Sequence, residues 1–270
     1  LGGFGNDQLF GSDGSDTLAG EAGDDHLEGG NDSDTMTGGA GADSIFGGSG
    51  PDDIGGGDDA DTLVGGTGND YIHGDLGNDF LFSSHYYEDF LSELATSTSM
   101  AGFSAPADDN NNYLAGGVGH DTLVGSSLYD TLEGGIGNDL LFGSYGADTI
   151  RGGTGNDTIV GFSDNLVDFF YASDDKTSDG FDRLNFDYTD AQDADIIYGF
   201  VANEDSIYIY GNGTSLIIND LNLTEVTEYD AITNAYVTSV TFGETVGSPQ
   251  ATIVNMTIAA LQAGGSFYFV

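Results

Sequence analysis

The stretch GGAGADSIF GGSGPDDIG GGDDADTLV GGTGNDYIH GDLGNDFLF, residues 38–82, consists of five consecutive nine-residue units with one internal pattern. The same phase extends back to Gly2, so that nine units fill residues 2–82. After an interruption the phase returns for six more units, residues 107–160. A fixed short period of this kind indicates a repeat architecture, in which each unit is a small structural element stacked on the next.

Three positions of the unit carry the pattern. Position one is Gly in 14 of the 15 units, position six is Asp in 14 of 15, and position eight is Leu, Ile or Met in all 15. Gly reaches turn conformations without steric cost, and a short segment with one inward aliphatic residue alternates like a strand. Two units therefore predict one coil of 18 residues, made of a turn, a strand, a second turn and a second strand.

The consensus GGxGxDxUx resembles the calcium-binding nonapeptide of the RTX (haemolysin-type) family. The resemblance covers residues 2–160 apart from the interruption. It implies an all-β fold, a parallel β-roll with 18 residues per coil, followed by a β-rich C-terminal capping and secretion region. It also implies a substrate of a type I (ABC) secretion apparatus, secreted or held at the cell surface of a Gram-negative bacterium.

The acidic residues of position six indicate that a cation binds between the rungs. Residues 18 apart lie on adjacent rungs, roughly 5 Å from each other, where two bare carboxylates repel by about 3 kcal/mol at an effective dielectric constant of 20. Long files of such pairs oppose folding unless a hard cation lies between them, and Ca²⁺ takes 6–8 oxygen ligands from carboxylates and backbone carbonyls. A merely solvated acidic face would not keep one phase over 15 units.

We therefore expect calcium ligands along the position-six files and, after the strict period ends, at one further Asp. These residues are Asp7, Asp16, Asp25, Asp34, Asp43, Asp52, Asp61, Asp70, Asp79, Asn112, Asp121, Asp130, Asp139, Asp148, Asp157 and Asp182. Counting pairs 18 apart within each block predicts about 10 calcium ions if every site is filled. Substitutions in the turns, such as Asp32, Asp59 and Leu128, are expected to weaken some of the sites.

Charge and composition exclude several classes of protein. The chain has 46 Asp plus Glu against 3 Lys plus Arg, a formal net charge of -43, so it would repel nucleic acids and anionic membranes. No apolar run is long enough to span a bilayer. There are 0 cysteines, which excludes disulfides and thiolate metal sites within these residues.

Nothing in the sequence indicates catalysis. The four histidines, His26, His73, His85 and His120, do not recur at one position, and neither an HExxH zinc motif nor a GxSxG elbow occurs. We expect no enzyme in this chain. Because the repeats begin at full strength next to Leu1, we expect a fragment whose upstream domains, with any catalytic one, lie before it.

The chain divides into four parts. Residues 1–82 and 107–162 are the two predicted β-roll blocks. Residues 83–106 interrupt them, and Tyr86, Tyr87, Phe90, Leu91 and Leu94 at helical spacing predict a short helix against the roll. Residues 163–270 are predicted as the β-rich cap. There SIYIY and SLIIN suggest a hairpin, YVTSVTF and ATIV suggest strands, and residues 255–263 suggest a helix.

Three functions remain open from the sequence. The favoured one is a calcium-binding module of a larger secreted protein, which folds on Ca²⁺ outside the cell after export. The second is a calcium-stiffened part of a self-assembling surface protein, an S-layer or an adhesin, with self-assembly or cell-surface polysaccharide as its partner. The third is the accessory C-terminal tail of a secreted hydrolase or alginate-modifying enzyme.

Overall fold

The computed structural model describes residues 1–84 and 111–161 and, beyond them, a set of strands between residues 169 and 269. After residue 160, only the side chain of Phe170 is described. In these residues the secondary structure consists of strands and turns, without a helix. The prediction of an all-β parallel coil is confirmed.

The strands of the first block are two to six residues long. They are β1 (Gly3–Phe4), β2 (Gln8–Asp13), β3 (Thr17–Ala22), β4 (His26–Asn31), β5 (Thr35–Ala40), β6 (Ser44–Ser49), β7 (Asp53–Asp58), β8 (Thr62–Thr67), β9 (Tyr71–Leu76) and β10 (Phe80–Phe82). The second block contains β11 (Tyr113–Val118), β12 (Thr122–Val124), β13 (Thr131–Ile136), β14 (Leu140–Ser144), β15 (Thr149–Thr154) and β16 (Thr158–Gly161).

Eight further strands follow. They are β17 (Phe169–Tyr171), β18 (Arg183–Asp187), β19 (Ala194–Tyr198), β20 (Ser206–Tyr210), β21 (Thr224–Asp230), β22 (Ala235–Phe242), β23 (Gln250–Val254) and β24 (Ser266–Phe269). The predicted strands SIYIY, YVTSVTF and ATIV correspond to β20, β22 and β23. The suggested hairpin is wrong, because β20 pairs on both sides with parallel strands, β18 and β24, and has no edge left for an antiparallel partner. Residues 215–219 and the two suggested helices lie outside the described residues.

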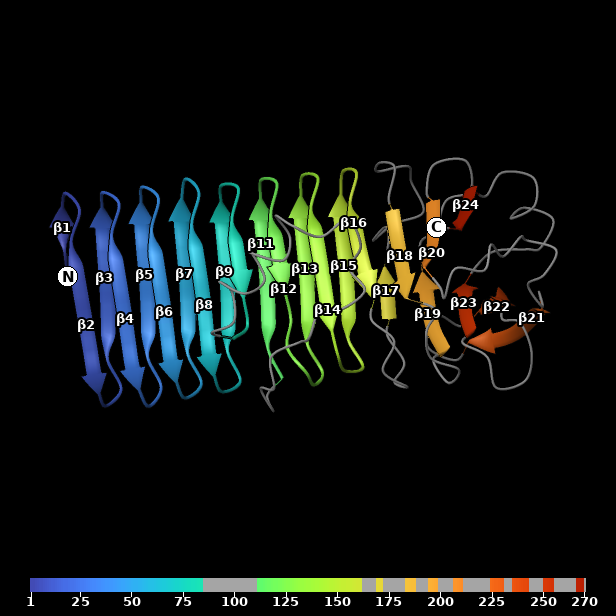
Figure 1. The fold of residues 1–270 in the computed structure, drawn as a ribbon, viewed down its shortest axis with the longest axis horizontal. Coiled ribbons are helices and arrows are strands. Elements are labelled where there is room, and N and C mark those ends of the chain that lie inside the picture. Colours follow the sequence, from blue (N-terminus) through green and yellow to red (C-terminus); the bar gives the residue numbers. More distant parts are fainter. Residues whose placement is uncertain are drawn as a thin grey trace.

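Successive strands alternate between two sheets, and both sheets extend along the length of the coil (Figure 1). The odd-numbered strands β1 to β19 form one sheet, which β23, β22 and β21 extend. The even-numbered strands β2 to β20, with β24, form the other. All neighbours are parallel except β21–β22 and β22–β23. Partners in the first block are 18 residues apart, as in Leu9↔Leu27, which confirms the predicted coil length.

The interruption leaves the coil and rejoins it without ending it. Strand β11 pairs with β9 through Tyr113↔Tyr71, and β12 pairs with β10 through Leu123↔Leu81. The two blocks are therefore one continuous stack. The stack also continues beyond Gly161, because β18 aligns Leu184 with Ile159 and β20 aligns Ile207 with Leu184.

The core is the ladder of position-eight side chains between the two sheets. From the second coil onward these residues are 0–1% exposed. They are Leu27, Met36, Ile45, Ile54, Leu63, Ile72, Leu81, Leu114, Leu123, Leu132, Leu141, Ile150 and Ile159. Phe170 extends the ladder in a stretch without the repeat, since it pairs with Ile150 and Ile197 and is fully buried.

The glycine of position one is required by a close approach. A Cβ on Gly20 would lie 2.7 Å from the carbonyl oxygen of Gly38 on the next rung, and nearer still to Oδ2 of Asp25. The same arrangement recurs at Gly29, facing Asp34 Oδ2 and the Gly47 carbonyl. Position one therefore stays small because the position-six carboxylate is folded back against it.

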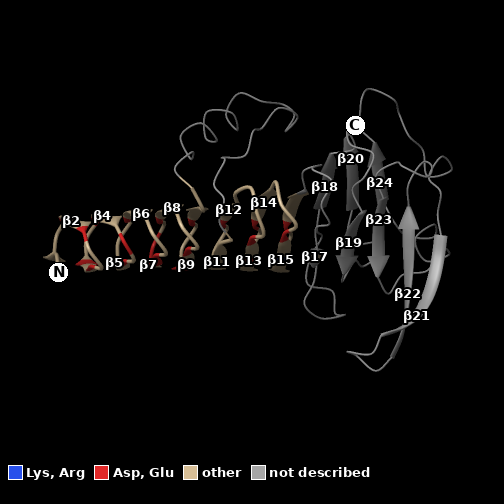
Figure 2. Ribbon diagram, turned by 90° about the horizontal axis from the view of Figure 1, so that it is seen from below, with Lys and Arg blue, Asp and Glu red and all other residues tan. Residues whose placement is uncertain are grey.

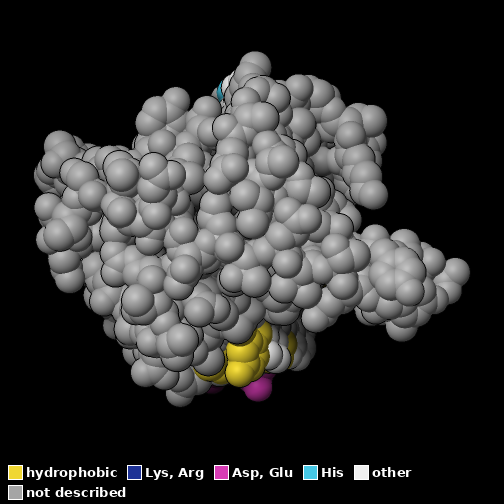
Figure 3. Space-filling model, turned by 90° about the vertical axis from the view of Figure 1, so that its right-hand side faces the viewer, with side chains coloured by type: hydrophobic (Ala, Val, Ile, Leu, Met, Phe, Trp, Pro, Cys, Tyr) yellow, Lys and Arg dark blue, Asp and Glu magenta, His cyan; other side chains and the backbone are white. Residues whose placement is uncertain are grey.

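Part of the surface is apolar. Leu76, Val118 and Ile136 are aligned on three neighbouring odd-numbered strands and are 44–58% exposed. Viewed along the coil from its C-terminal side, hydrophobic and acidic side chains of the described residues lie next to each other (Figure 3). Among the described residues, no helix has the length and apolar character needed to cross a membrane.

Candidate metal centres

Each position-six residue lies where a turn meets a strand. Asp25 directly precedes β4, and Asp43 directly precedes β6. Acidic residues consequently recur rung after rung along the described coil (Figure 2). The position-six residues from Asp25 to Asp157 are at most 3% exposed, whereas Asp7 and Asp16, at the open first coil, are half-buried. Burial of so many carboxylates is unusual, because an unpaired charge is costly to remove from water.

Hydrogen bonds link these residues into two files. The backbone N–H of Asp25 donates to Oδ1 of Asp43 at 2.7 Å, and that of Asp43 donates to Oδ1 of Asp61 at 2.7 Å. The files that the sequence predicts are therefore present. One oxygen of each linked carboxylate is satisfied by the preceding rung, which fixes the side chain in place.

The register adds two neighbours that the 18-residue spacing missed. Across the interruption, the N–H of Asp79 donates to Oδ1 of Asp121 at 2.8 Å, and that of Asp70 donates to Oδ1 of Asn112 at 2.9 Å. These pairs are 42 residues apart in sequence. The conserved phase on both sides of the interruption was the signal that could have predicted them.

The second carboxylate oxygen has no donor at ten of these positions. Within the described part of the chain, Oδ2 is buried and accepts no hydrogen bond from a protein group. The ten residues are Asp7, Asp16, Asp25, Asp34, Asp43, Asp52, Asp61, Asp79, Asp121 and Asp139. Because buried polar atoms in folded proteins almost always have partners, a regular series of orphaned oxygens indicates that another group satisfies them.

Asp130 is different. Its Oδ2 accepts hydrogen bonds from the backbone N–H and the hydroxyl of Ser126. The amide of Asn112 in turn donates to the Ser126 hydroxyl at 3.2 Å. Ser126 occupies a turn position that is Gly in most units, so a change in the turn supplies protein donors to the carboxylate here.

The carboxylates resist ionisation in the metal-free coil. Burial raises the pKa of Asp61, Asp79 and Asp139 to about 7; hydrogen bonds from backbone N–H groups oppose this, and carboxylates on adjacent rungs add to it. Burial likewise raises the pKa of Asp43 and Asp52 to about 6. With 3 basic residues against 46 acidic ones, protein cations are too few to neutralise the files.

Backbone carbonyls are the other oxygen atoms present in the turns. In the turns, a Cβ on Gly23 would collide with the backbone carbonyl of Gly5, and a Cβ on Gly41 with that of Gly23, one rung earlier in each case. Both Gly23 and Gly41 have positive φ, 130° and 124°, a backbone conformation that glycine adopts without steric cost. In the described residues no group of three or more His, Cys, Asp or Glu side chains converges. A bound cation would therefore combine two carboxylates with backbone oxygens, a set suited to a hard ion such as Ca²⁺.

The histidines do not form a site among the described residues. His26 pairs with Glu28 at 3.0 Å and lies between the rings of Phe10 and Phe46. His73 pairs with Asp75 at 3.0 Å. Nδ1 of His120 accepts the backbone N–H of Asn138 at 2.8 Å, and His85 lies outside the described residues. Asp182 also lies outside them, two residues before Leu184.

Comparison with known proteins agrees with this chemistry. The family model described as the RTX calcium-binding nonapeptide repeat (4 copies) matches residues 1–36, 20–54, 28–62, 55–84, 107–141 and 124–159. These matches together cover just over half of the chain. In a comparison with curated proteins, nothing matches.

Among solved structures, the chain is similar to the crystal structure of the extracellular lipase LipA from Serratia marcescens. The aligned region covers 81% of this chain and 40% of the lipase chain. The sequence identity is 17% and the TM-score is 0.24. The chain thus spans less than half the length of that lipase. The match of the repeat model over both blocks, together with the files of buried carboxylates, establishes that this chain belongs to the RTX calcium-binding nonapeptide-repeat family.

Proposed function

We propose that this chain is a calcium-dependent folding module of a larger secreted protein. The observation that carries the proposal is the series of ten buried Oδ2 atoms without a protein donor. Such atoms destabilise a fold unless a ligand satisfies them, and their spacing repeats with the coil. A cation bound at each of these rungs would satisfy these oxygen atoms, and its binding would then be the main source of the coil's stability.

The negative charge of the two files favours the unfolded chain without calcium and the folded coil with calcium. Without a divalent cation, neighbouring carboxylates repel by about 3 kcal/mol per pair at an effective dielectric constant of 20. Each bound ion that prefers the folded coil adds stability by mass action, about 2.7 kcal/mol at a hundredfold excess over its Kd. With several sites, the balance changes from unfolded to folded over a narrow range of calcium concentration.

The ligands that we assign are the position-six carboxylates together with turn carbonyls of the adjacent rung. The inter-rung neighbours Asp79–Asp121 and Asp70–Asn112 join the pairs counted within each block. The neighbourhood of Asn112 and Asp130 is the least suited to a cation, because Ser126 already donates to the Asp130 carboxylate. Asp182 is assigned to the file of Asp157, because it precedes Leu184 by two residues in the sequence and Leu184 aligns with Ile159.

Calcium-dependent folding suits a protein that is exported as an unfolded chain. A chain of net charge -43 that stays unfolded at low calcium can pass through a type I secretion apparatus as an extended polypeptide. Outside the cell, calcium at the concentrations that extracellular modules bind, with Kd roughly 10⁻⁴ to 10⁻³ M, would fold it. We assign the protein on this basis to the cell exterior of a Gram-negative bacterium.

A calcium titration tests the proposal. The chain is brought to pH 8 in a chelator, and its far-ultraviolet circular dichroism is followed as Ca²⁺ is added, with Mg²⁺ as the control cation. We expect a cooperative gain of β-structure with Ca²⁺ at sub-millimolar to millimolar concentrations and little change with Mg²⁺. A coil that is fully formed in chelator would refute the proposal.

A further inference from the structure

The turn at residues 125–130 differs in backbone shape from the other turns of the coil. In every other complete turn among the described residues, the residue at position two has a positive φ, as at Gly30 and Ser144. Ser126 at position two and Leu128 at position four both lack it. This turn stacks on the one that ends at Asn112, through which the chain rejoins the coil after the interruption.

Both carboxylate oxygens of Asp130, the last residue of this turn, are satisfied by protein groups. Oδ2 accepts the backbone N–H and, at 3.1 Å, the hydroxyl of Ser126. Oδ1 accepts the backbone N–H of Asn112 at 2.7 Å, and the Asn112 side-chain amide donates to the Ser126 hydroxyl at 3.2 Å. Oδ2 of Asp61, by contrast, accepts no hydrogen bond from a protein group. The orphaned oxygen that indicates a cation elsewhere is therefore missing at Asp130.

The charge between these two rungs is also lower than elsewhere. Asn112 is the single position-six residue of the 15 units that is not Asp, so the gap between Asn112 and Asp130 holds one carboxylate instead of two. The repulsion between two bare carboxylates, which a cation relieves in other gaps, is absent here. Burial raises the pKa of Asp130 to about 6, and hydrogen bonds from Ser126 and Asn112 oppose the rise. Protein donors thus stabilise the charge that remains.

Side chains on the odd-numbered strands link the same rungs. The rings of Tyr71 and Tyr113 stack with centroids 4.9 Å apart and planes 4° from parallel. They lie on β9 and β11, the odd-numbered strands on either side of the interruption. The Tyr113 hydroxyl donates to Oε2 of Glu133 at 2.6 Å, and Nη1 of Arg151 donates to Oε1 of Glu133 at 3.2 Å. These contacts connect four neighbouring strands, β9, β11, β13 and β15 (Figure 1), through side chains that are not assigned as calcium ligands.

We propose that these rungs form a junction that joins the two blocks of the coil without calcium. The gap between Asn112 and Asp130 takes no cation, because Ser126 and the Asn112 amide supply the interactions that a cation supplies in the other gaps. The inference rests on the proposed function, in which those other gaps bind calcium.

The interruption gives a physical reason for such a junction. Neighbouring rungs are 42 residues apart in sequence here instead of 18, and closing a longer loop costs more chain entropy. Contacts that form at any calcium concentration offset this cost and fix the register at the place where the regular spacing does not. The calcium-binding gaps on either side then extend the coil from aligned rungs.

Returning this gap to the repeat pattern tests the proposal. The variant carries Asn112→Asp, Ser126→Gly and Leu128→Gly, which introduce the residues that most units have at these positions. Urea unfolding of the full chain between roughly 0.3 and 30 mM Ca²⁺ at pH 8 gives the calcium dependence of the unfolding free energy. The variant should release one more calcium ion on unfolding than the wild type, which steepens this dependence by about 1.4 kcal/mol per tenfold change in calcium.

Two negative results have different meanings. If the variant folds and its calcium dependence equals that of the wild type, the native gap already holds an ion, and the proposal is overturned. If the stability of the wild type does not depend on calcium at all, the proposed function itself fails, and the junction fails with it.

The single change Ser126→Ala covers the case in which the three-position variant does not fold, as judged by circular dichroism in calcium. It removes only the hydroxyl that connects Asn112 to Asp130. Its urea midpoint should fall by the same amount at low and high calcium, whereas Ser49→Ala, the same change at an exposed turn residue, should leave the midpoint unchanged. An unchanged midpoint in Ser126→Ala, or a fall that grows with calcium concentration, would overturn the proposal.

Discussion

Replacing Asp61 by Asn separates the role of a position-six charge from the role of its shape. Asp61 accepts the N–H of Asp43 through Oδ1 at 2.7 Å, and its own N–H donates to Asp79 at 2.8 Å. Asn keeps the Oδ1 acceptor and the volume, but it removes the carboxylate from two inter-rung positions. If each position holds one ion, the variant binds two fewer calcium ions on folding.

The magnitude follows from linkage. Each ion lost lowers the dependence of the unfolding free energy on calcium by about 1.4 kcal/mol per tenfold change in concentration. Asp61→Asn should therefore lower this slope by about 2.7 kcal/mol per tenfold change. At 10 mM Ca²⁺ and a Kd near 10⁻⁴ M, the two sites contribute about 5 kcal/mol. The substitution also removes a buried carboxylate whose pKa is raised to about 7. Removing this charge stabilises the folded coil by about 2 kcal/mol after a discount for solvent screening, which offsets part of the loss.

Urea unfolding between 0.3 and roughly 30 mM Ca²⁺ at pH 8, followed by circular dichroism, measures this slope. The matched control is Asp53→Asn, which makes the same change in charge at an outward side chain of the same region that is 60% exposed. The control should leave the slope unchanged. An Asp61→Asn protein with the slope of the wild type would refute the reasoning, whatever its absolute stability.

Three further outcomes are expected. First, protein without calcium should gain β-structure, measured by circular dichroism, as the pH falls from 8 to 5. The pKa values of Asp79 and Asp139 are raised to about 7 in the folded coil, so the coil takes up protons as the pH falls and gains stability. A circular dichroism signal that does not change with pH would contradict this. Second, Gly20→Ala should weaken calcium-dependent stability by about 1–3 kcal/mol, since its Cβ meets Asp25 and the Gly38 carbonyl; unchanged urea midpoints would argue against the close approach. Third, Met36→Ala should cost about 2–5 kcal/mol at any calcium concentration because it leaves a cavity in the core ladder, and a calcium-dependent loss would contradict this.

Most of the fold follows from the nine-residue period. Position eight identified the core from Leu27 to Ile159, and the spacing of 18 placed neighbours such as Asp25 and Asp43 on adjacent rungs. This works because every coil repeats the same local geometry, so that one unit determines the rest. Phe170 escaped prediction because the strict nine-residue phase ends at Val160 and the chain rejoins the ladder out of phase, although Asp168 precedes Phe170 by the same two residues that separate positions six and eight.

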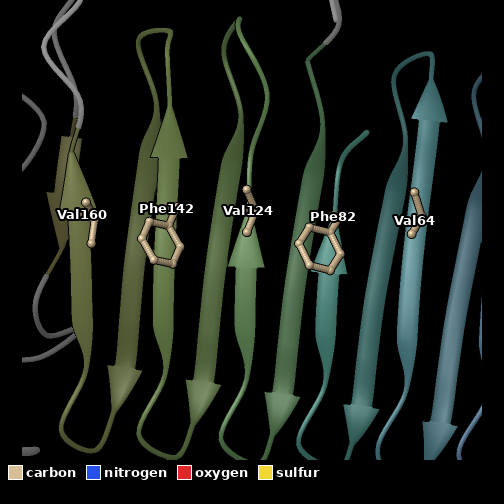
Figure 4. Packing of buried hydrophobic residues seen from close by; sticks show 5 residues of the cluster. All are labelled: Val64, Phe82, Val124, Phe142 and Val160. Carbon is tan, nitrogen blue, oxygen red and sulfur yellow. The ribbon is translucent and has the colours of Figure 1, made fainter. Parts of the chain in front are cut away.

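The site could be predicted in its ligand type but not in its details. The pairing of Asp79 with Asp121 depends on where the interrupted chain rejoins the stack, which composition alone does not determine. The donors that Ser126 supplies to Asp130 depend on the shape of a single turn. The burial of the position-nine residues Val64, Phe82, Val124, Phe142 and Val160 (Figure 4) was missed. Val and Phe at this strand position are also common as exposed β-formers, and only their burial distinguishes the two cases.

Anomalous scattering from a crystal of this chain grown in calcium tests whether the position-six files bind the metal. We expect calcium peaks between successive position-six residues, each next to a buried Oδ2 such as those of Asp43 and Asp61, in a coil with the strand register described above. The same coil with only water beside these oxygens would contradict it.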